Sequence, residues 1–171
     1  MKVNRNFRTL YILLAVCQIL LCNYIGLSPY VMLSLLPAMI LCIPLTTGTP
    51  LCLLIAFVTG LAVDWISEGL IGLNTAAIVP VALMRKPFIR TFIGEDLIAR
   101  SENFSMRKNG FTKILFALIS SVALYLAIYI FLDGAGTRPM WFSLSRFGIS
   151  LVCNMILGFI VVNILTGEDR K

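Results

Sequence analysis

Few side chains in this chain of 171 residues could carry out chemistry. Histidine is absent, which removes the commonest general base and the usual zinc ligand. No two cysteines have the two-residue spacing of a zinc or redox motif, and all five lie inside apolar runs, at Cys17, Cys22, Cys42, Cys52 and Cys153. We interpret them as buried free thiols. The sequence therefore predicts a protein that is not an enzyme, with no catalytic residue, metal site or cofactor.

The most informative polar residues form one short stretch. Gly60 and Asp64 are four positions apart and share one helix face, so another helix can approach closely at the glycine, beside the carboxylate. Gly69 and Gly72 then allow the chain to turn back tightly, and Asn74 is placed to form a hydrogen bond with Asp64. Two interpretations remain open. Asp64 either ends a helix at the membrane surface, or pairs with a neighbouring helix and fixes a polar hairpin.

The composition shows which environment must hold these residues. Apolar residues make up 59% of the chain and charged residues 13%, and the mean hydropathy is +0.95. A soluble domain carries about 25% charged residues, so this chain belongs in a lipid bilayer. The net charge of +6 fits topology signals and contacts with lipid headgroups. Membrane lipids are therefore expected partners, and nucleic acid is not.

Charged residues mark where membrane helices end, because an ionisable side chain costs several kcal/mol at the bilayer centre. We predict one integral membrane domain over 1–171, an all-α bundle of six transmembrane helices, with spans near 9–27, 30–45, 50–66, 69–84, 113–132 and 146–166. The second to fourth runs offer about 24 Å of helix against a hydrocarbon core of about 30 Å. Neighbouring helices must shield them, or they include re-entrant pieces. Pro37 and Pro80 imply kinks.

Basic residues predict the orientation of the bundle. With six spans and both termini in the cytoplasm, twelve of the fourteen lysines and arginines lie on the cytoplasmic side. Only Arg138 and Arg146 then lie outside. A five-span arrangement would place one basic terminus on the wrong face.

The predicted cytoplasmic loop, residues 85–112, contains a segment with helical periodicity. From Pro87 to Ile98, apolar residues recur on one face, which predicts one cytoplasmic amphipathic helix at the membrane surface. Arg85, Lys86 and Arg90 are expected to meet anionic lipid headgroups. A docking surface for a protein partner is the alternative.

Small residues at four-residue spacing predict where helices pack, because association in lipid depends on close approach. Ala117 with Ser121, and Asn154 with Gly158, mark such faces on the last two spans. Asn154 and Asn163 lie within the bilayer, where they either form interhelical hydrogen bonds or line a solute pocket.

The stretch Gly60-Leu61-x-x-Asp64, followed by Gly72-Leu73-Asn74, resembles the glycine and aspartate signature of the MreD family of rod-shape-determining membrane proteins. Chain length, six short apolar runs and a basic loop after the fourth run resemble that family too. Matched residue by residue, Gly60, Asp64, Gly69 and Gly72 fall on the signature hairpin, and Asn74 departs from it.

The resemblance implies a non-enzymatic scaffold of the bacterial cell-elongation machinery, the elongasome, in the cytoplasmic membrane. Such a scaffold binds an MreC-like protein and works with a RodA-like glycosyltransferase, an elongation transpeptidase and an MreB-like actin. It couples peptidoglycan synthesis to cell shape. The fold implied is similar to that of the substrate-binding subunits of energy-coupling-factor transporters.

A solute-binding membrane subunit of a transporter is the alternative function. Six spans, kinked helices and polar groups within the bilayer fit that role. Subunits of the energy-coupling type tend to carry an Ala-x-x-x-Ala stripe on the first helix, and Leu10 to Leu27 lacks one.

Overall fold

The computed structural model describes residues 5–24, 30–68, 71–94, 110–134 and 138–166. Over these ranges the protein is almost wholly helical and has no β-strand. The α-helices are α1 (Arg5–Tyr24), α2 (Leu36–Leu41), α3 (Thr49–Val63), α4 (Leu73–Phe92), α7 (Phe111–Gly134) and α8 (Met140–Thr166). A π-helical turn, η1 (Asp64–Glu68), continues α3.

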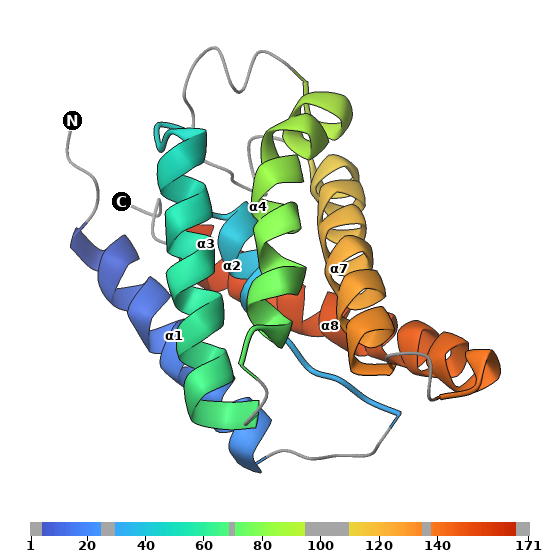
Figure 1. Cartoon of the computed structure of the whole chain (residues 1–171). Helices are drawn as coiled ribbons and strands as arrows, with labels where there is room; N and C mark the ends of the chain where they lie inside the picture. The colour runs from blue at the N-terminus through green and yellow to red at the C-terminus, as the bar shows by residue number, and fades with distance from the viewer. Residues whose placement is uncertain (1–4, 25–29, 69–70, 95–109, 135–137, 167–171) are drawn as a thin grey trace.

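Three long helices, α3, α4 and α7, stand side by side and alternate in direction (Figure 1). α1 lies beside α3, α8 crosses obliquely behind the bundle, and α2 occupies the middle. We call the end where α3 passes into α4 the hairpin end, and the end where α4 stops and α7 begins the loop end. The first turn of α1 and the last turn of α8 both lie toward the loop end.

Four helical stretches are long and apolar enough to cross a membrane, at Phe7–Tyr24, Thr49–Ile66, Phe111–Gly134 and Met140–Leu165. They correspond to the first, third, fifth and sixth predicted spans. Large apolar side chains, such as Ile12, Leu54 and Ile156, are exposed along them, as expected of surfaces that face lipid. The protein is a multi-pass helical membrane protein.

The second predicted span, 30–45, is wrong as a transmembrane helix. Only α2 is helical there, and its six residues provide about 9 Å of helix. Pro37 occupies the first turn of α2 instead of kinking a longer helix. A proline suits that position, because it needs no hydrogen-bond acceptor there and disfavours helix in the residue before it. Residues 30–35 precede α2 without helical structure, and α2 itself is completely buried.

The fourth predicted span, 69–84, and the separate amphipathic helix after it also need correction. α4 runs without a break through Pro80 and Pro87 to Phe92, so Pro87 does not begin a new helix. Residues 95–98 of the predicted amphipathic helix lie outside the described residues.

Arg85 does not reach lipid headgroups as predicted, because it is only 2% exposed. It follows Ile78 and Val81 on the buried face of α4, where the helical repeat turns it inward. Lys86 is half-buried, and Arg90 is exposed.

Close packing occurs at two of the predicted glycines. A Cβ atom on Gly60 would lie 2.8 Å from Thr75 Cα, so α3 and α4 approach each other directly at this point. A Cβ atom on Gly158 would lie 3.0 Å from the methyl groups of Leu118 on α7. Ala117 and Ser121 are fully buried on α7, and Ser121 Oγ donates a hydrogen bond to Ala117 O.

Candidate functional site

Asp64 joins the end of α3 to the start of α4 at the hairpin end. Its side chain is fully buried. Oδ1 accepts a hydrogen bond from the Asn74 backbone N–H (2.8 Å), and Oδ2 accepts three, from the Gly72 N–H (3.1 Å), the Thr75 N–H (3.0 Å) and the Thr75 hydroxyl (2.7 Å). The N–H groups of Asn74 and Thr75 belong to the first turn of α4, and Gly72 directly precedes it. N–H groups at the start of a helix have no partners within that helix and lie at the positive end of its dipole. Asp64 therefore caps α4 from outside that helix.

The backbone at Gly72 explains why the residue that caps α4, Asp64, lies eight positions earlier in the sequence. Gly72 precedes α4 with φ of 103°, a left-handed conformation that glycine adopts at little cost. Having no side chain, it cannot supply the capping oxygen that serine or aspartate usually provides at this position. Asp64 supplies that oxygen, and Gly60 lets α4 come close enough. Gly69 lies outside the described residues.

Asn74 meets Asp64 through its backbone N–H and not through its amide. Its side-chain Oδ1 instead accepts a hydrogen bond from the Tyr125 hydroxyl on α7. The bond ties the hairpin to a third helix. Of the two interpretations of Asp64, the structure has the polar hairpin and not the exposed helix end.

The hairpin presents apolar side chains outward at its tip. Trp65, Ile66 and Ile71 are 74%, 56% and 69% exposed. Asp64, between the buried face and this tip, is enclosed by four donors and cannot reach an outside molecule as a base. These side chains form an exposed apolar surface at the hairpin end.

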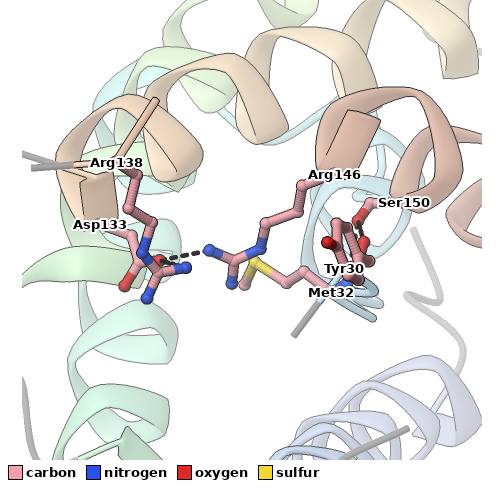
Figure 2. Close-up of polar contacts among 6 residues, drawn as sticks. All are labelled: Tyr30, Met32, Asp133, Arg138, Arg146 and Ser150. Carbon is pink, nitrogen blue, oxygen red and sulfur yellow. Dashed lines mark hydrogen bonds and ion pairs between the residues drawn. The ribbon is translucent and has the colours of Figure 1, made fainter. Parts of the chain in front are cut away.

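A second polar network, not foreseen from the sequence, lies around residues 30–35. Asn154 on α8 accepts a hydrogen bond from the Ser34 N–H (2.6 Å) and donates one to Met32 O (2.6 Å). Ser150, one turn earlier, accepts from the Met32 N–H (2.9 Å) and donates to Tyr30 O (3.4 Å) (Figure 2). These side chains replace the hydrogen bonds that a helix would have made, as irregular backbone within a membrane requires.

Gln18 on α1 completes this network from the other side. Its Oε1 accepts a hydrogen bond from the Leu35 N–H (2.6 Å), and its Nε2 donates to Leu33 O (3.4 Å). Asn154 thus bonds to backbone and not to a polar side chain of another helix, and Asn163 is exposed. The sequence signal that could have revealed this network is Gln18, a polar residue in the middle of an apolar run.

Arg85 holds the other end of α2. Its Nε donates to Leu41 O (3.3 Å), one of the carbonyls left without a partner at the end of that helix. One terminal nitrogen lies 3.9 Å from Cys52 Sγ, and the other has no hydrogen-bond partner among the described residues. The guanidinium therefore fixes α2 against α4 inside the bundle.

No protein-family model matches the chain, and no curated protein or solved structure matches it significantly. Membership of the MreD family therefore stays a prediction. The expected similarity to energy-coupling-factor subunits stays a prediction.

Proposed function

We propose that this protein is a non-enzymatic scaffold of the bacterial cell-elongation machinery, and that it binds an MreC-like partner at the hairpin end. The proposal includes the cytoplasmic membrane as its location and the RodA-like glycosyltransferase, elongation transpeptidase and MreB-like actin as further associates. The observation that carries it is the hairpin itself, in which the buried Asp64 carboxylate holds an exposed apolar tip.

Hydrogen bonds to Asp64 hold the described backbone next to two of the exposed side chains of the tip, which favours docking. Exposed aromatic side chains contribute much of the energy of protein interfaces, and a surface that is already ordered loses less entropy on binding. Trp65 follows Asp64 directly in the chain, and Ile71 precedes the capped Gly72. The hydrogen bonds of Asp64 therefore hold the backbone next to Trp65 and next to Ile71.

The distribution of charge supports the proposed orientation. Lys86, Arg90 and Lys113 lie near the loop end, whereas Arg138 and Arg146 lie near the hairpin end. Positive residues concentrate on the cytoplasmic side of membrane proteins. With the loop end in the cytoplasm, both termini are cytoplasmic and the hairpin faces outward.

The test replaces exposed residues of the tip without touching its hydrogen bonds. In a strain depleted of the native protein, we expect Trp65→Ala combined with Ile71→Ser to accumulate normally, to fail to restore rod shape and to lose co-purification of the MreC-like partner. Phe57→Ala is the matched control, because Phe57 is also exposed on α3, two turns earlier. Normal rods with undiminished co-purification from the double variant would contradict the proposal.

The solute-binding alternative has less support. It needs polar groups that face a solute, but the amide of Asn154 is occupied by the backbone of residues 32 and 34. If the gene for this protein lies beside genes for an actin-like protein and penicillin-binding proteins, that position would favour the scaffold function over solute binding.

A further inference from the structure

A cluster of charged residues lies at the hairpin end, between α7 and α8, apart from the Asp64 hairpin. Asp133 near the end of α7 faces Arg138 and Arg146 (Figure 2). Arg146 forms a close ion pair with Asp133 Oδ2, and Arg138 Nη1 lies 3.5 Å from the same oxygen. One carboxylate therefore meets two guanidinium groups, and the cluster carries a surplus positive charge.

The exposed fractions of the side chains show which arginine carries the unbalanced positive charge. The side chains of Arg146 and Asp133 are only 12% and 16% exposed, so these two neutralise each other in a largely enclosed pair. The Arg138 side chain is 41% exposed, and its guanidinium lies 5.4 Å from the ring centre of Phe142. A guanidinium has five N–H donors, more than a single contact with Asp133 can use. Arg138 is therefore the cation that an outside anion can reach.

Arg138 also lines an apolar groove of about 440 Å³. Its walls come from the end of α7 and the first turns of α8, and include Phe131, Met140, Trp141, Leu144 and Phe147. The volume lies within the range typical of small-molecule sites, about 300–1,000 Å³. Met140 and Trp141 are largely exposed near the end of a membrane helix, where aromatic side chains lie at the headgroup level.

We propose that this groove binds an anionic phospholipid, with the phosphate on Arg138 and part of an acyl chain along the apolar walls. Charge complementarity selects the headgroup, because one carboxylate cannot balance two guanidinium groups. The apolar lining selects a ligand that also has a hydrocarbon part. The site also explains why two arginines lie at an end of the bundle that is otherwise poor in basic residues.

The chain has two tryptophans, so Trp65→Phe leaves Trp141 as the only tryptophan, whose fluorescence can be excited selectively, and it lies in the groove. The protein is reconstituted into phosphatidylcholine vesicles that contain increasing fractions of lipid with brominated acyl chains, which quench tryptophan on contact. We expect brominated phosphatidylglycerol to quench Trp141 at about a fivefold lower fraction than brominated phosphatidylcholine, since one basic residue near a membrane contributes roughly that factor.

Three variants in the same background test the role of the charge. Arg138→Gln should remove the preference for phosphatidylglycerol, and Arg138→Lys should keep most of it. Lys113→Gln, the same change of charge at the loop end, should have no effect. Soluble glycerol phosphate should not reverse the quenching, which distinguishes a lipid from a free phosphate.

Equal quenching by the two lipids in the Trp65→Phe protein would overturn the proposal, as would an unchanged preference in Arg138→Gln. Absence of quenching by either lipid would mean that protein covers the groove, which also overturns it. Reversal of the quenching by glycerol phosphate would mean that the groove binds a soluble anion and not a lipid, which also overturns the proposal.

Discussion

Replacing Asp64 by asparagine should destabilise the protein far more than the loss of a surface charge would. An amide has one oxygen and one NH₂ group, whereas the carboxylate accepts hydrogen bonds on both of its oxygens. If the amide oxygen faces Thr75, the NH₂ group points at the Asn74 N–H, and two donors oppose each other. The substitution exchanges one oxygen atom for an NH₂ group, and the donors around Asp64 offer that group no acceptor.

The magnitude follows from the contacts. A buried N–H without a partner costs about 1–3 kcal/mol, and loss of a charge beside a helix N-terminus costs up to about 2 kcal/mol in a partly buried site. We therefore expect Asp64→Asn to lower the free energy of unfolding by about 3 kcal/mol. Asp64→Leu leaves three N–H groups without a partner and should cost about 6 kcal/mol at about 2 kcal/mol each. Thr75→Val removes one hydroxyl donor and should cost about 1 kcal/mol.

Reversible unfolding of the purified protein in mixed micelles, titrated with a denaturing detergent, measures these differences. Thr112→Val is the control, because Thr112 is exposed at the start of α7. Amide hydrogen exchange adds a local measurement, since the N–H groups of Gly72 and Asn74 should lose protection in Asp64→Asn. A change below about 0.5 kcal/mol in Asp64→Asn, the range of ordinary surface substitutions, would refute the account of the cap.

Three further predictions concern packing, the polar network and topology. Gly158→Leu should separate α8 from α7 and lower the unfolding temperature measured by circular dichroism, whereas Gly148→Ala, where nothing lies within 4 Å, should lower it little or not at all. Asn154→Leu leaves one buried N–H and one buried carbonyl without partners, so the same detergent titration should show a loss of about 4 kcal/mol; an unchanged free energy would mean that water reaches residues 32–34. In a background without native cysteines, Pro139→Cys should react with an impermeant maleimide in intact spheroplasts and Thr112→Cys should not, and the reverse result would invert the proposed orientation.

Features that depend on neighbouring residues were predictable from the sequence. Asp64 and Asn74 are ten positions apart, and the glycines around them signal a tight return of the chain, whereas the hydrogen bonds from Thr75 to Asp64 were not predicted. Apolar runs long enough to span a bilayer were likewise found where the structure has α1, α3, α7 and α8. In both cases the physical cause lies within one stretch of sequence.

Features that depend on distant partners were not predictable in this way. Residues 30–35 look like part of a spanning helix, because their hydrogen-bond partner Asn154 lies about 120 positions later. Arg85 looks like a surface residue by charge, yet the carbonyl that its guanidinium contacts, on Leu41, is 44 positions earlier. Periodicity and charge rules cannot detect a side chain that completes another segment's backbone.

The dependence of residues 30–35 on α8 has a consequence for how the protein is made. Ser150 and Asn154 come late in synthesis, so the early non-helical segment cannot satisfy Met32 and Ser34 in the membrane until the last helix arrives. A nascent chain interrupted before residue 150 would therefore hold unpaired polar backbone groups in lipid, which cost several kcal/mol each. Insertion of α8 would then complete two parts of the fold at once, its own helix and the hydrogen bonds of a segment made more than 100 residues earlier.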